Sequence, residues 1–263
     1  MRIRTTTTTV AALSGAVALS AFAVPAAQAA DSVQGSTRIT KVVVNGGKDL
    51  VVGTSTKRFT VTVTGTDPKG IKDGIALLWR GTKFEPELLT GVLAPGDEAK
   101  CTKVDATTGT CKLSFEASPR ETLANRNAGQ WKVLAGLLAK GSAEDHVVKE
   151  RYKTVTVKRA AKLTVNASPE PVSKGRTITV AGALTRANWD TKKYAGYTKQ
   201  SVKLQFKKKG ASAYTTVKTV KSDTRGNLRT TVKASADGTF RYVFAGTSTT
   251  PAVTSSGDAV DVR

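Results

Sequence analysis

The side chains best placed to bind a ligand are basic residues that alternate with apolar ones near the C-terminus. Val202, Leu204 and Phe206 are interleaved with polar residues, and 228–232 and 240–242 show the same alternation. Residues with this period of two point to opposite faces of a β-strand. If these strands are neighbours, one outer face carries five cations: Lys203, Lys207, Arg229, Lys233 and Arg241. Such a stripe predicts salt-dependent attraction of a polyanion, although a solvated sheet face has the same pattern.

A polar insertion in the same region contains three aromatic residues, Trp189, Tyr194 and Tyr197. Exposed aromatic rings at the end of a β-sandwich can stack on sugar rings, so these three are the expected contacts if the ligand is a glycan. The alternative is that they cap the apolar core. Two other aromatic residues, Trp131 and Phe240, occupy matching strand positions and are predicted core residues.

Acidic and nucleophilic residues give weaker signals. Asp67 and Asp73 flank a turn and are weak calcium candidates, but calcium needs six to eight oxygen ligands and lysines interrupt this turn. The alternative is that Asp67 accepts local backbone hydrogen bonds. The single histidine, His146, follows two acidic residues in a predicted loop without an evident nucleophile. We therefore expect no catalytic residues, no enzyme activity and no cofactor.

The first 30 residues have the composition of an export signal. Arg2 and Arg4 precede an apolar run over 10–24, and Ala27-Gln28-Ala29 has the small-x-small pattern of a cleavage site. The apolar run is short and rich in alanine, unlike a membrane span. We expect residues 1–30 to be a Sec signal peptide, and the mature chain to be secreted, extracellular and without a membrane span.

Export to an oxidising compartment favours a disulfide between the two cysteines. Cys101 and Cys111 are separated by a turn-forming segment, and a close pair in an oxidising compartment forms a disulfide. Closing such a short loop contributes roughly 2–3 kcal/mol in the chain-entropy description. The sequence therefore predicts a structural Cys101–Cys111 disulfide.

Most of the remaining chain consists of short alternating runs between Gly, Pro, Asp and Asn, a pattern typical of all-β proteins. A weak internal repeat divides it: Arg58–Gly65 resembles Arg176–Gly182, and Gly129–Gly136 resembles Gly238–Gly246. The order of the repeated strands resembles that of an immunoglobulin-like (Ig-like) sandwich.

This repeat predicts two consecutive Ig-like β-sandwiches, over 31–160 and 161–263. Ser118, Pro119 and Glu121 have the pattern of a helix N-terminus, which predicts one short helix in the first sandwich. Trp79, at the end of an apolar run, is the expected inter-sheet aromatic residue of strand C.

The second half, from GRTITVAGALTRANWD through QSVKLQF and GTFRYVFAGTSTT to AVDVR, resembles a recurrent actinobacterial secreted Ig-like domain. The first half, with FTVTVTGTDPKGIKDG and a later Gly-x-Trp strand, is similar to bacterial extracellular Ig-like domains. Together they resemble streptomycete exported proteins with tandem domains of unknown function. The resemblance implies a sandwich fold and supplies no catalytic residues.

The net charge of the chain indicates what class of partner to expect. The chain has 263 residues with 41 Lys plus Arg against 20 Asp plus Glu, a net charge of +21. Residues 31–160 contribute +7, whereas the smaller segment 161–263 has 18 basic and six acidic side chains, a net +12. Without a recognition helix or RNA-binding strand signature, specific nucleic-acid binding is not expected.

The combined expectation is a secreted, non-catalytic binding or structural module that contacts an anionic cell-wall polymer or polysaccharide. Two alternatives remain open from the sequence: a calcium-stabilised extracellular structural protein and a secreted hydrolase.

Overall fold

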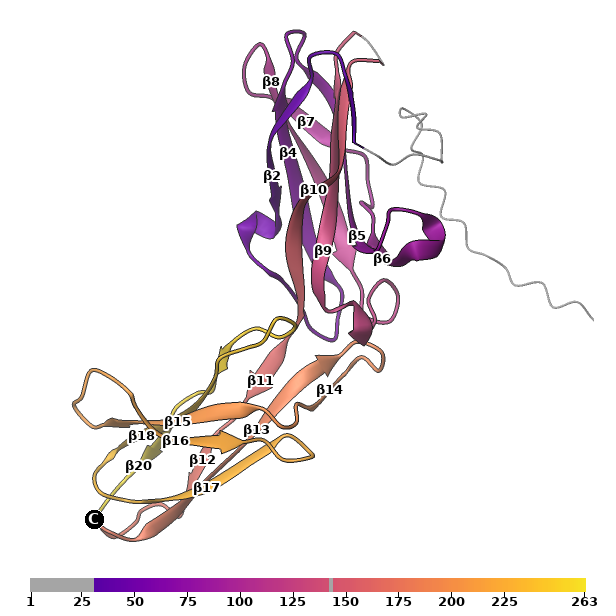
Figure 1. Ribbon diagram of the computed structural model, residues 1–263. Coiled ribbons are helices and arrows are strands. Elements are labelled where there is room, and N and C mark those ends of the chain that lie inside the picture. Colours follow the sequence, from indigo (N-terminus) through magenta and orange to yellow (C-terminus); the bar gives the residue numbers. More distant parts are fainter. Residues whose placement is uncertain (1–30, 142–143) are drawn as a thin grey trace, which may run out of the picture.

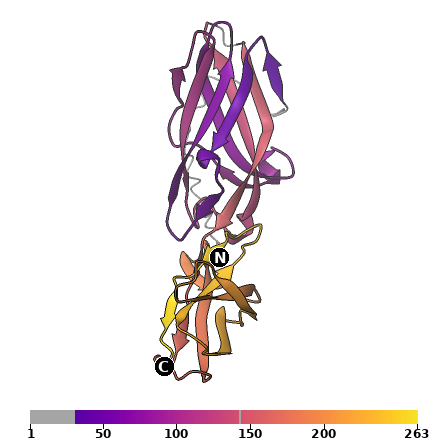
Figure 2. The ribbon, with the colours of Figure 1, turned by 90° about the vertical axis from the view of Figure 1, so that its left-hand side faces the viewer.

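The computed structural model describes residues 31–141 and 144–263, so the predicted signal peptide lies outside the described part of the chain. The described chain is all-β, and its strands form two sandwiches that follow one another end to end (Figures 1 and 2). The helical elements in these ranges are three short 3-10 turns: η1 (Asn45–Gly47), η2 (Pro86–Leu88) and η3 (Asn125–Asn127).

The first sandwich has two layers. One is a four-stranded sheet in the order β2–β4–β8–β7, with the bounds β2 (Arg38–Val44), β4 (Lys57–Thr66), β8 (Thr108–Ala117) and β7 (Lys100–Lys103). The other is a six-stranded sheet in the order β1–β10–β9–β5–β6, with β3 beside β10: β1 (Ser32–Gln34), β10 (His146–Arg159), β9 (Gly129–Ala139), β5 (Ile71–Gly81), β6 (Leu89–Leu93) and β3 (Leu50–Val52).

The second sandwich also has two layers. In one, the long strand β13 lies at the centre: β11 (Ala161–Leu163), β12 (Asn166–Ser168), β13 (Thr177–Asn188), β14 (Lys193–Gly196) and β17 (Asn227–Lys233). The other has the order β16–β15–β18–β19, with β20 also beside β18: β16 (Thr215–Lys221), β15 (Ser201–Lys208), β18 (Gly238–Phe244), β19 (Val253–Thr254) and β20 (Asp258–Val260).

Equivalent strands pair in the same way in both sandwiches. β4 pairs with β8 as β13 pairs with β17, and β5 pairs with β9 as β15 pairs with β18. These are the B–E and C–F pairs of an Ig-like sandwich, so the repeat seen in the sequence is a repeat of the fold.

Alternation along the strands builds both cores. Val61 and Val63 of β4 face Leu78 and Trp131 of the opposite sheet, and all four are fully buried. In the second sandwich the buried side chain of Tyr242 reaches from β18 to the opposite sheet. Its hydroxyl donates a hydrogen bond to the backbone oxygen of Val180 on β13, at 2.9 Å. The core assignments of Trp131 and Phe240 are confirmed.

Trp79 is buried, but on the outer side of its sheet and not between the two sheets, where it was expected. Leu78 points into the core between the sheets, and Trp79 therefore points outward with Leu134 and Val148. The segment between β5 and β6 folds over it, and Phe84 packs against the indole with 5.3 Å between ring centroids. The prediction of an inter-sheet Trp79 is wrong because this loop creates a second, smaller apolar cluster outside the sheet.

The predicted helix after Ser118 does not form. The backbone N–H groups of Thr122 and Leu123 both donate to the oxygen of Ser118, and the chain makes a single turn there. Arg120 has a φ of +72°, which a helix cannot accommodate. The chain turns back here, and Leu123 is buried in the core.

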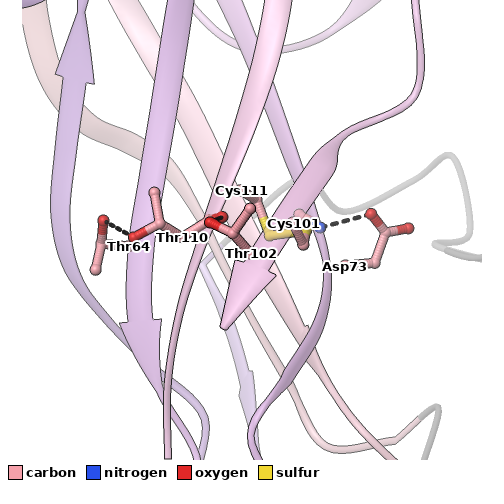
Figure 3. The surroundings of a disulfide bond; sticks show 7 residues. Thr64, Asp73, Cys101, Thr102, Thr110 and Cys111 are labelled. Carbon is pink, nitrogen blue, oxygen red and sulfur yellow. Dashed lines mark hydrogen bonds between the residues drawn. A yellow bond between two sulfur atoms is a disulfide. The ribbon is translucent and has the colours of Figure 1, made fainter. Parts of the chain in front are cut away.

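The predicted disulfide is present. Cys101 of β7 and Cys111 of β8 are opposite each other in the strand register, and Cys111 is fully buried between the layers (Figure 3). Its interior position depends on Gly74 of β5, where a Cβ atom would lie 2.7 Å from the Cβ of Cys111. The disulfide therefore fastens an edge strand to the core.

Candidate polyanion-binding face

Three of the five predicted basic residues lie on one outer face of the second sandwich. Lys203 and Lys207 point outward from β15, because Val202, Leu204 and Phe206 point inward. Arg241 points outward from β18, where it is opposite Gln205 in the register. We call the outer surface of β16, β15 and β18 the basic face.

The other two predicted residues lie on the opposite side of the sandwich. Arg229 and Lys233 belong to β17, which pairs with β13 and not with β15 or β18. Leu228 and Val232 turn into the core, so the two cations turn outward from the other sheet. The prediction of one stripe of five cations is therefore wrong: its condition, that the strands are neighbours, is not met.

The cations of the basic face have no carboxylate partners within residues 31–141 and 144–263. Lys203, Lys207 and Arg241 take part in none of the ion pairs of this part of the chain. At the rim, Lys209 does pair with Asp237, at 3.4 Å. The basic face thus presents positive charge that no carboxylate of the described ranges pairs with.

An aromatic residue that the sequence analysis missed lies on this face. Tyr214 immediately precedes β16 and is half-buried. The guanidinium carbon of Arg241 is 3.6 Å from the centroid of its ring, and the Nζ atom of Lys207 is 5.2 Å from it. No strand alternation includes Tyr214, so only the fold brings it to the two cations.

Trp189, the expected contact if the ligand is a glycan, is fully buried. It follows β13 and enters the apolar core of the first sandwich, where its Nε1 donates a hydrogen bond to the backbone oxygen of Val52 at 3.1 Å. Its ring is not available to a glycan, and the alternative that it caps an apolar core holds, although that core is the one of the first sandwich.

The junction around Trp189 is closed by polar contacts as well. The amide of Asn125 donates to Asn188 and Asp190, and Lys192 forms an ion pair with Glu121 at 3.0 Å. Buried Arg159 donates from Nε to the backbone oxygen of Ala187. Burial, together with the nearby guanidinium of Arg186, lowers the pKa of Arg159 to about 10.

Tyr194 and Tyr197 lie beside this junction and are half-buried. The predicted loop is a hairpin, in which β14 pairs with the end of β13. Lys162 lies 4.2 Å from the ring centroid of Tyr194, and Arg186 lies 3.9 Å from that of Tyr197. Each of the two rings is therefore already in contact with a cation of the second sandwich.

The weak calcium candidates do not converge. Asp67 is buried, and it accepts hydrogen bonds from the hydroxyls of Ser36 and Thr37 and from the backbone N–H of Lys69. Asp73 accepts one from the backbone N–H of Gly74. In residues 31–141 and 144–263 no group of three or more His, Cys, Asp or Glu is arranged to hold a metal ion.

His146 begins β10 instead of lying in a loop. Its Nε2 atom is 3.1 Å from the hydroxyl of Ser32 on the neighbouring strand. This contact joins β1 to β10, so the role of His146 that the structure shows is structural.

A surface hollow of about 440 Å³ lies in the first sandwich. It is lined by residues of β1, β2 and β10, including Arg38, Lys149 and Arg151. Lys149 pairs with Asp31 and Arg151 with Glu150, so much of its positive charge is neutralised internally. The basic face is the stronger candidate for an anionic ligand.

Across the described ranges, no helix has the length and apolar character needed to cross a membrane.

The fold defines a tandem of Ig-like β-sandwiches. The profile of a family described as "Family of unknown function (DUF5707)" matches residues 50–137, from β3 to most of β9. No curated protein matches the chain.

Solved structures resemble the chain at low identity. Dimeric latent PorU from Porphyromonas gingivalis has 13% identity and a TM-score of 0.29, over 86% of this chain and 20% of that one. The I-band fragment I67–I69 from titin has 14% identity and a TM-score of 0.30, over 86% and 65%. The D0-D1 domain of intimin has 14% identity and a TM-score of 0.27, over 86% and 100%. The chain thus spans about a fifth of PorU and 65% of the titin fragment.

Proposed function

We propose that the protein is a secreted, non-catalytic binding module whose second sandwich holds an anionic cell-envelope polymer on the basic face. The observation that carries the proposal is the row formed by Lys203, Lys207 and Arg241, which no carboxylate of residues 31–141 and 144–263 neutralises. Export is supported by the N-terminal sequence and by the Cys101–Cys111 disulfide, which persists in oxidising compartments.

A linear polymer suits this row better than a compact anion. Lys203 and Lys207 are four residues apart on one strand, which separates their Cα atoms by about 13 Å. A chain of repeated charges that lies along the strand can contact both ammonium groups without either side chain bending toward the other. Attraction between exposed charges is screened by salt, so the complex should weaken as ionic strength rises.

The test measures retention of the chain of residues 31–263 on isolated cell walls at low and high salt. The double variant Lys203→Glu, Lys207→Glu should lose at least about tenfold in affinity, because reversing a charge turns attraction into repulsion. Arg229→Glu, Lys233→Glu is the matched control, since it changes the net charge equally on the opposite face. Equal loss in both variants, or retention that ignores salt, would show that the basic face is not the binding surface.

A further inference from the structure

The guanidinium group of Arg241 is held on two sides. The ring of Tyr214 covers one of its faces at 3.6 Å, and the Oε1 atom of Gln205 accepts a hydrogen bond from its Nε at 2.9 Å. Gln205 lies opposite Arg241 in the strand register, so the backbone itself sets this contact. The side chain is therefore ordered before any ligand arrives.

This arrangement leaves the far end of Arg241 available. The two contacts use the ring face and the Nε–H, and no ion pair among the described residues involves its terminal nitrogens. A planar guanidinium presents parallel N–H donors that match two oxygens of one oxyanion. Because its orientation is already fixed, binding costs less side-chain entropy than for a free arginine.

The surroundings indicate which oxyanion fits. Lys207 adds a second cation beside the Tyr214 ring, and Thr216 and Thr239 add hydroxyls on the neighbouring strands. One surface hollow is lined by residues of β1, β2 and β10, and another by residues that include Val217, Val232 and Lys233. Lys203, Lys207 and Arg241 line neither of them, and a polymer that carries charge in its backbone can lie along the strands without being enclosed.

We propose that Arg241, held between Tyr214 and Gln205 with Lys207 beside it, binds the phosphodiester groups of a polyol- or sugar-phosphate polymer. The threonine hydroxyls then face the polyol units on either side. This assignment rests on the proposed function, which places a polyanion on the basic face, and it adds the chemical class of that polymer.

Two variants test the assignment without changing the net charge. Arg241→Lys keeps the charge but removes the parallel donors, and Tyr214→Ala keeps every charge but frees the guanidinium. Binding of poly(glycerol phosphate), oligogalacturonate and polyglutamate is measured calorimetrically at 0.15 M salt. Both variants should bind poly(glycerol phosphate) about tenfold more weakly, Arg241→Lys because the parallel donors are lost and Tyr214→Ala because the guanidinium is less well held before binding. Binding of polyglutamate, whose carboxylates are on flexible side chains, should change less.

Arg229→Lys, the same replacement on the opposite face, is the matched control and should bind all three polymers like the unmodified protein. Thermal melting checks that each variant is folded. If Arg241→Lys keeps full affinity for poly(glycerol phosphate), the site is overturned while the basic face stands. If oligogalacturonate binds as tightly and with the same dependence on Arg241, the ligand is a carboxylate and the phosphodiester assignment is overturned. If the unmodified protein binds none of the polymers even at low salt, the proposed function itself fails.

Discussion

The indole N–H of Trp189 donates its hydrogen bond to the backbone oxygen of Val52, so a residue of the second sandwich completes the core of the first. Only Ala160 separates the last strand of one sandwich from the first strand of the next. The backbone N–H of Ala160 also donates to the oxygen of Val52, which joins the connection and the tryptophan at one point. The two sandwiches are therefore coupled through packing as well as through the chain.

Replacing Trp189 by alanine should lower the free energy of unfolding by about 3–5 kcal/mol, the usual cost of deleting a buried tryptophan side chain. Chemical denaturation monitored by circular dichroism measures this loss. Trp189→Phe is the control, because it keeps an aromatic ring and removes the hydrogen bond, at a cost nearer 1 kcal/mol. An alanine variant as stable as the unmodified protein would mean that the junction contributes little.

Replacing Gly74 by alanine should destabilise the first sandwich by about 1–3 kcal/mol, the range for overpacking a core. The new Cβ would lie 2.7 Å from the Cβ and 3.0 Å from the Sγ of Cys111, closer than real contacts allow. Gly96→Ala is a matched control, since a Cβ there has no atom within 4 Å. Thermal unfolding compares the two, and equal melting temperatures would contradict the steric conflict.

Tyr242 should make stability sensitive to alkaline pH. Burial raises the pKa of this hydroxyl from 10.0 to about 12, because the charged form is poorly solvated in the core. A raised folded-state pKa contributes stability that is fully present below about pH 10 and is lost as pH rises through about 12.

Tyr242→Phe should therefore be less stable than the unmodified protein at pH 8, by about 1 kcal/mol for the lost hydrogen bond to Val180. The difference should shrink as the pH approaches 12, because phenylalanine has no proton to lose. Urea unfolding at several pH values measures it. A difference that stays constant with pH would show that Tyr242 does not titrate in this window.

Local sequence patterns predicted the strands and the disulfide because those features depend on residues near one another in the chain. Alternation alone placed Lys203 and Lys207 on one face of a strand, as the structure has them. It could not say which strands are neighbours. The Ig-like order did contain that information: strand E pairs with strand B, which puts Arg229 on the sheet opposite Arg241.

The contacts of three aromatic residues could not be predicted from the sequence. Trp189 is buried by the other sandwich, Trp79 by a loop folded back over its sheet, and Tyr214 meets Arg241 from a turn without any periodic pattern. In each case the partner is distant in sequence, and the contact depends on tertiary packing that no local window records.

The inserted tryptophan also has a mechanical consequence. To bend at the connection, the second sandwich would first have to withdraw the indole of Trp189 from an apolar environment and break its bond to Val52. Small displacements at the connection are therefore resisted by the core itself and not only by surface contacts. A load applied to the second sandwich would therefore be transmitted to the first through this buried contact.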